Sequence, residues 1–171
     1  MKKFFFLVIA LCPMLAFANY STLGVKYVNW DLSGCYGGCP TIDGPGVQYS
    51  GAINNNILLD FQYADVGTDY ASVDYTIAQA AYAFGDLDSG AFHIGAASFD
   101  AGYDRENVAA IGYSRRGGDE FDYTIAVLDT DIDTTVSIAF RTTMGITLDL
   151  MSSGGDNLIG IGYSWKLGQN N

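Results

Sequence analysis

The stretch that decides the fold is residues 159–167, which reads Ile-Gly-Ile-Gly-Tyr-Ser-Trp-Lys-Leu. Every second residue is apolar or aromatic, and the residues between them are small or polar. Because successive side chains of a β-strand point to opposite faces of a sheet, this period of two predicts a strand with one apolar and one polar face. A strand of this kind has an apolar environment on one side and a polar environment on the other.

The same alternation recurs along the chain. It is clear in residues 121–127, in residues 146–150 and in residues 57–64, where Leu58 is the exception. Breaks rich in Gly, Asn and Asp, which are typical of turns, separate the alternating segments. No segment after residue 18 shows sustained helical periodicity. We expect ten strands, at residues 20–32, 45–54, 56–66, 71–84, 90–100, 105–115, 120–129, 134–142, 145–151 and 157–167.

The strand count depends on the weakest of these breaks, at residues 142–145. If the chain does not turn there, the count falls to eight or nine. Closed bacterial barrels have an even number of strands, so eight is the alternative to ten.

The first residues have the pattern of a secretion signal. Lys2 and Lys3 precede the apolar residues 4–11, and Ala16-Phe17-Ala18 has the form of a cleavage site. We therefore expect a signal peptide at residues 1–18 and a single mature domain at residues 19–171. Lipid attachment at Cys12 is a less favoured alternative, because the residue before such a cysteine is normally small and here it is Leu11.

Acidic residues outnumber basic residues in the chain by 19 to 8. Removal of residues 1–18 takes away two lysines and no acid, so the mature chain is more acidic still. Such a surface disfavours nucleic acid as a partner, because its binding relies on Lys and Arg to neutralise phosphates. The many aromatic and β-branched residues also argue against disorder.

Three features favour a membrane barrel over a soluble secreted β-sandwich, whose strands alternate in the same way. The polar faces are rich in small residues, which suit the narrow interior of a small barrel. The charges gather at the breaks between strands. Aromatic residues stand near strand ends, where the bilayer interface favours them: Tyr27, Trp30, Tyr70, Tyr113, Tyr163 and Trp165. The sequence thus predicts an all-β fold, a closed antiparallel up-and-down transmembrane β-barrel of eight to ten strands, with the sandwich as the alternative.

With its secretion signal, its alternating strands and a closing strand that carries Gly160, Tyr163 and Trp165, the chain resembles the small outer-membrane β-barrels. That group includes the OmpA-like transmembrane domain and the porin-like family, and no subfamily is indicated. The resemblance implies a monomer in the outer membrane of a Gram-negative bacterium, in contact with lipid and lipopolysaccharide and without a cofactor. It also implies that Gly160, Tyr163 and Trp165 form a signal read by the barrel-assembly machinery. Members of the group usually end on an aromatic residue, whereas here Leu167 is followed by Gly-Gln-Asn-Asn.

His93 is the only histidine, so any Ser–His or metal mechanism would depend on it. The outer-membrane lipid A deacylases have a His-x-Ser arrangement, in which an acid orients the imidazole. Here the sequence is His-Ile-Gly, so the serine is missing at that spacing. A contact of His93 with Ser98, Ser114 or Asp122 across strands is left open, and a histidine in a polar network, in the lumen or at the interface, is the favoured interpretation.

Several aspartates are predicted to face inward. Asp60 and Asp74 lie on neighbouring expected strands, which makes a catalytic carboxylate pair a minor alternative. We expect Asp122 and Asp149 to pair instead with inward Arg141 or Lys166 and to close the interior with ion pairs. Arg115 and Arg116 fall at an expected turn, where solvation is the ordinary interpretation.

Two expected loops carry candidate sites. Asp129, Asp131 and Asp133 place three carboxylates in one short loop, which would suit Ca²⁺ or Mg²⁺. Because the glycine and glutamate of an EF-hand are missing, a solvated acidic turn is favoured and no metal site is assigned. In the loop at residues 33–44, Cys35 and Cys39 are predicted to form a disulfide, since two thiols fall short of the four ligands of a zinc site.

Function is less determined than fold, because one fold hosts many activities. We expect a non-enzymatic outer-membrane barrel with a structural, surface-interaction or narrow-pore role. The alternatives are an enzyme that modifies outer-membrane lipid through His93 and a secreted soluble β-sandwich.

Overall fold

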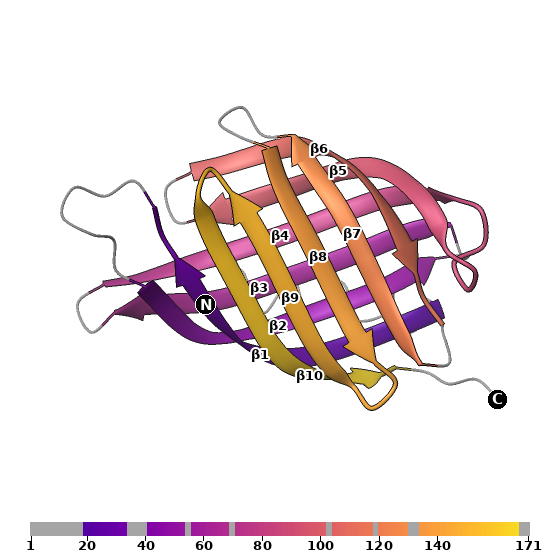
Figure 1. Ribbon diagram of the computed structural model, residues 1–171, viewed down its shortest axis with the longest axis horizontal. Coiled ribbons are helices and arrows are strands. Elements are labelled where there is room, and N and C mark those ends of the chain that lie inside the picture. Colours follow the sequence, from indigo (N-terminus) through magenta and orange to yellow (C-terminus); the bar gives the residue numbers. More distant parts are fainter. Residues whose placement is uncertain are drawn as a thin grey trace.

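The computed structural model describes residues 19–33, 41–53, 56–68, 71–101, 104–117, 120–129 and 134–167. Ten antiparallel strands form one sheet, in which each strand pairs with its neighbours in sequence. The first strand also pairs with the last, so the sheet closes into a barrel (Figure 1). The predicted closed up-and-down barrel is therefore confirmed.

The strands are β1 (Asn19–Asp31), β2 (Thr41–Ile53), β3 (Ile57–Thr68), β4 (Ala71–Phe84), β5 (Ala91–Ala101), β6 (Asp104–Arg115), β7 (Phe121–Asp129), β8 (Thr134–Thr142), β9 (Ile146–Ser153) and β10 (Asp156–Lys166). Among the described residues, no helix is long and apolar enough to cross a membrane.

The turn between β8 and β9 settles the strand count at ten. The backbone N–H of Gly145 donates to the carbonyl oxygen of Thr142 at 2.9 Å. Gly145 has a φ of 93°, a left-handed conformation that glycine adopts without steric cost. Residues 142–145 thus form a tight turn, and the eight-strand alternative is wrong.

β2 begins at Thr41, four residues earlier than expected, so Pro45 lies within a strand. The pairing of β2 with β3 passes from Asp43↔Gly67 to Gly46↔Ala64 and skips Pro45. Since proline has no N–H to donate to a ladder, it is tolerated where the pairing is interrupted.

The two ends of the barrel differ in what lies there. The terminal end holds the start of β1, the end of β10 and the turns β2–β3, β4–β5, β6–β7 and β8–β9. The distal end holds the other five connections. Figure 1 shows the strands running obliquely between these two ends.

Alternate side chains face outward and inward as the sequence predicts. On β10, the outward residues Ile161, Tyr163 and Trp165 are 44–60 % exposed. The inward residues of β10 are small or buried and include Leu158, at 3 % exposure, and Ser164, at 4 %. The outside of the barrel is therefore apolar, and the interior holds the tightly packed residues.

Three apolar clusters lie inside the barrel. The distal cluster contains Val28, Trp30, Ile42, Ala64, Val66, Tyr75 and Leu158. A terminal cluster contains Ala52, Leu58, Ala81, Ala83, Leu87 and Ala91. A side cluster on β5, β6 and β7 contains Ala97, Val108, Ala110, Ala126 and Leu128.

Candidate functional site

Lys26 is the most deeply buried charge of the lumen, the space enclosed by the barrel. Its side chain is fully buried and lies 3.3 Å from Oδ2 of Asp149. It also donates to Oε1 of Gln62 at 2.5 Å and lies 5.7 Å from the centre of the Tyr75 ring. A buried ammonium requires such partners, because an unpaired charge out of water is costly.

Arg116 forms a second ion pair, with Asp60. Its Nη2 donates to both carboxylate oxygens of Asp60, at 2.9 and 2.8 Å. Its Nη1 donates to Oγ of Ser50 at 2.5 Å and to the carbonyl oxygen of Gly51 at 3.3 Å. The interpretation of Arg116 as a solvated turn residue is therefore wrong, since only 4 % of the residue is exposed.

Arg141 and Asp122 form the third ion pair. Asp122 also accepts a hydrogen bond from the backbone N–H of Gly117 at 2.8 Å. This confirms that Asp122 and Asp149 face inward and pair with cations. Lys26, rather than the exposed Lys166, is the lysine that pairs with Asp149.

The alternation itself contains the signal for the two cations that sequence reasoning missed. Lys26 is in phase with the buried Val28, and Arg116 is in phase with the buried Ser114. Both positions therefore belong to the inward face, although Arg116 lies one residue beyond the end of β6.

A cavity of about 90 Å³ lies between these ion pairs. Its lining includes Gln79 and Thr147, whose Nε2 and Oγ1 atoms are buried without a hydrogen-bond partner among the described residues. A polar cavity of this size has room for a few water molecules. The middle of the lumen is thus polar and holds a small cavity.

His93 faces the lumen and is 2 % exposed. Its Nδ1 lies 3.3 Å from Oγ of Ser114, which in turn lies 2.9 Å from Oγ1 of Thr124. The other ring nitrogen, Nε2, has no partner in the described part of the chain, so no acid orients the imidazole there. Because Ser114 is fully buried, neither lipid nor solvent reaches this pair.

The structure does not bring the other candidate carboxylates together. Asp60 faces the lumen, whereas Asp74 is exposed and accepts a hydrogen bond from Tyr63 at 3.0 Å. A catalytic Asp60–Asp74 pair is therefore wrong. Trp30 was expected at the bilayer interface but lies inside, 6.0 Å from the Tyr75 ring.

The two candidate loops lie largely outside the described residues. Asp129 ends β7 and is exposed, while Asp131, Asp133, Cys35 and Cys39 are not described. The ion site and the disulfide remain predictions. Within the described ranges, no three His, Cys, Asp or Glu side chains are placed to hold a metal ion.

The predicted assembly signal lies on β10, the strand that closes the barrel. Gly160 faces the lumen opposite Asp149, and Tyr163 and Trp165 face outward. The two rings meet edge to face with their centres 5.2 Å apart. Their recognition by the assembly machinery remains a prediction.

No protein-family model and no curated protein matches the chain. Three solved structures are similar to it over nearly their whole length. The N-terminal β-barrel domain of Pseudomonas aeruginosa OprF shares 13 % identity, with a TM-score of 0.35, and covers 86 % of this chain and 99 % of its own. Neisserial surface protein A shares 14 % identity, with a TM-score of 0.37, and the match covers 86 % of this chain and 96 % of that protein. Ail, the attachment invasion locus protein of Yersinia pestis, was solved with a heparin analogue. It shares 12 % identity, with a TM-score of 0.29, and the match covers 85 % of this chain and 96 % of that protein.

Proposed function

We propose that this chain is an outer-membrane β-barrel with a closed lumen, which acts as a membrane-embedded surface protein rather than as a channel or an enzyme. The observation that carries the proposal is the packing of the distal half of the lumen. In this arrangement the distal loops face the cell surface and form the part available to partners.

The outward face supports a membrane location. Large apolar side chains are exposed on strands all round the barrel, for example Val25, Ile94, Ile111, Ile138 and Ile161, which are 37–60 % exposed. Soluble proteins rarely leave an apolar surface of this extent in contact with water. A barrel crosses a bilayer without unpaired backbone groups, because its sheet has no edge.

Two apolar clusters support a closed lumen. In the distal cluster, Val28, Val66 and Tyr75 have no exposed surface. In the side cluster, Ala110 has none and Leu128 has only 4 %. Since a water-filled channel would leave its lining accessible, the burial of these residues supports a closed distal half.

Recording in planar lipid bilayers tests the closed lumen. We expect the mature protein to show no discrete openings. A W30A/Y75A variant removes two large rings from the distal cluster and should give openings or a raised leak, which shows that the assay detects a pore of this barrel. The matched control is Tyr27→Ala, which removes an outward ring and should stay silent. Stepwise openings of the unchanged protein would contradict the proposal.

Cell fractionation tests the location separately. We expect the mature chain in the outer-membrane fraction, with a mobility in detergent gels that changes on boiling. Recovery in the soluble periplasm would contradict the proposed membrane location, although the closed barrel already excludes the β-sandwich fold.

A further inference from the structure

We propose that the outer surface of this barrel fits a bilayer whose hydrocarbon core is unusually thin. The inference rests on the proposed membrane location and adds the kind of bilayer that the wall fits. It follows from two rows of outward side chains that stay six residues apart on the strands that carry both.

The first row is aromatic and lies near the terminal end. On four neighbouring strands it consists of Phe92, Tyr113, Tyr123 and Phe140. The pairing places Phe92 beside Tyr113 and Tyr123 beside Phe140, and the rings of Phe92 and Tyr113 lie 5.1 Å apart. Tyr163 and Tyr82 extend the row to β10 and β4, and a second layer of rings lies beyond it toward the terminal end, at Phe84, Phe121 and Trp165. Aromatic rows of this kind mark the edge of the apolar band of a membrane barrel.

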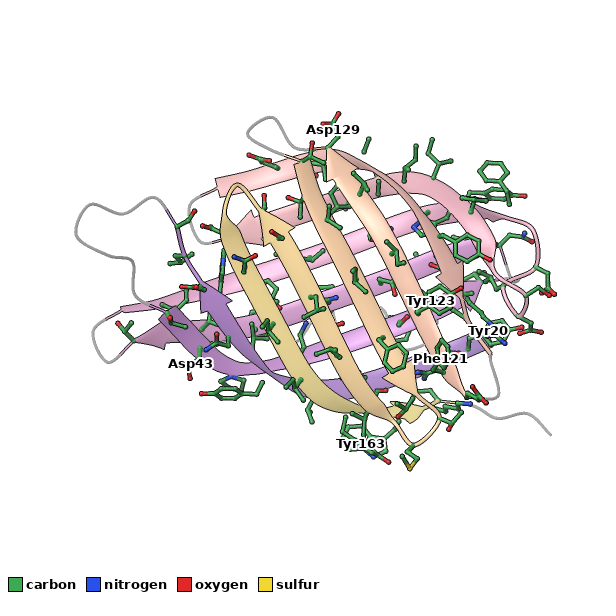
Figure 2. All side chains as sticks on the ribbon, in the orientation of Figure 1. Tyr20, Asp43, Phe121, Tyr123, Asp129 and Tyr163 are labelled. Atoms are coloured by element: carbon green, nitrogen blue, oxygen red, sulfur yellow. The ribbon has the colours of Figure 1, made fainter. Side chains whose placement is uncertain are left out.

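The second row is polar and lies nearer the distal end. Its outward residues occur as register pairs, Ser98↔Asn107, Asp129↔Thr134, Ser152↔Asn157 and Asn29↔Asp43. Figure 2 shows Phe121, Tyr123 and Tyr163 toward one end of the barrel and Asp43 and Asp129 toward the other. The row includes the carboxylates of Asp43 and Asp129, which hydrocarbon does not accommodate.

The two rows are six residues apart on strand after strand. The separation runs from Phe92 to Ser98 on β5, from Tyr123 to Asp129 on β7 and from Tyr163 to Asn157 on β10. Only two outward residues lie between the rows on each of these strands, as with Ile125 and Val127 on β7.

This separation gives the height of the apolar band. Six residues of a strand span about 20 Å, and a tilt typical of membrane barrels reduces this to about 15 Å along the membrane normal. The usual band is about 25 Å tall. Because drawing carboxylates into hydrocarbon is costly, a thicker bilayer must thin around the barrel.

The test is equilibrium urea unfolding of the mature protein in vesicles of dimyristoleoyl-, dioleoyl- and dierucoyl-phosphatidylcholine, approached from both the folded and the unfolded side. We expect the midpoint to be highest in the shortest-chain lipid and to fall with each longer one. A midpoint that is independent of chain length, or highest in a longer-chain lipid, would overturn the inference.

Two triple variants separate the effect of the height of the apolar band from the effect of its hydrophobicity. N107L/S152L/N157L replaces uncharged members of the polar row and should move the optimum to a longer-chain lipid. A78L/A96L/A109L adds the same three leucines at exposed positions inside the band and should leave the optimum where it is. The inference fails if the second variant shifts the optimum and the first does not. Failure to insert into any of the vesicles would instead defeat the proposed membrane location itself.

Discussion

At the scale of single residues, three ion pairs stabilise the interior of this barrel. Lys26, Arg116 and Arg141 each lie against an aspartate on a different strand. The pairs therefore link β1 to β9, the end of β6 to β3, and β8 to its neighbour β7. Removing one member leaves the other charge buried alone, which costs more than the pair itself contributes.

Replacing Lys26 with methionine tests this dependence. The substitution keeps the length of the side chain but leaves Asp149 without its cation, so we expect a loss of about 3–5 kcal/mol in the free energy of unfolding. Urea titration in vesicles measures the loss. The double variant K26M/D149L removes both charges and should recover most of the stability, and a double variant as unstable as the single one would contradict this account.

Gly112 tests the packing around His93. A Cβ at this position would lie 2.6 Å from both Cε1 and Nε2 of the imidazole and nearer still to the carbonyl oxygen of Ile125. Gly112→Ala should therefore cost about 1–3 kcal/mol in unfolding free energy. The control is Gly160→Ala in refolded protein, because a Cβ there meets its nearest atoms at 3.4 Å, an ordinary contact. Equal stability of the two variants would refute the clash.

At the scale of elements, the β4–β5 turn covers part of the lumen at the terminal end. Leu87 is fully buried and packs in the terminal cluster. Its carbonyl oxygen accepts from the N–H of Arg116 at 2.8 Å, and that of Asp88 accepts from Nε of Arg115 at 3.0 Å. The turn is thus hydrogen-bonded to the C-terminal end of β6, and Leu87 belongs to the core.

Leu87→Ala should destabilise the barrel more than a usual turn substitution does. Truncating a fully buried leucine costs about 2–5 kcal/mol, depending on how far the site collapses. Hydrogen exchange of the amides in β4 and β5 should increase together with the drop in unfolding free energy. A loss no greater than that of Asp86→Ala, in the same turn, would show that Leu87 does not contribute to the core.

The strands were predictable because a wall between two media imposes a period of two on every strand. The break at residues 142–145 was the weakest signal in the sequence, although Gly145 permits the turn that closes there. The inward position of Arg116 was missed because this residue follows the last residue of β6, although its phase with Ser114 places it on the inward face. Trp30 was misplaced for a related reason: its type fits the interface, and only its phase with Val28 places it inside.

At the scale of the whole molecule, the proposed assembly signal on β10 can be tested in cells. Tyr163→Ala with Trp165→Ala removes the two outward rings of β10, which the resemblance to outer-membrane barrels assigns to the assembly signal. We expect the variant to refold in vesicles but to accumulate several-fold less in the outer membrane of cells. Tyr82→Ala with Phe84→Ala, an outward aromatic pair on β4 with centres 5.1 Å apart, is the matched control. Equal accumulation of the two variants would remove the special role of β10.

The pairing of β1 with β10 also has a consequence for synthesis. Residues 22–31 pair with β2 along one edge and with residues 157–166 along the other, so one edge of the first strand made must wait for the last strand. A chain cut short before β10 keeps two open edges, and each edge offers unpaired backbone groups to any other chain. A premature stop before β10 is therefore expected to produce aggregates in place of a slightly smaller barrel.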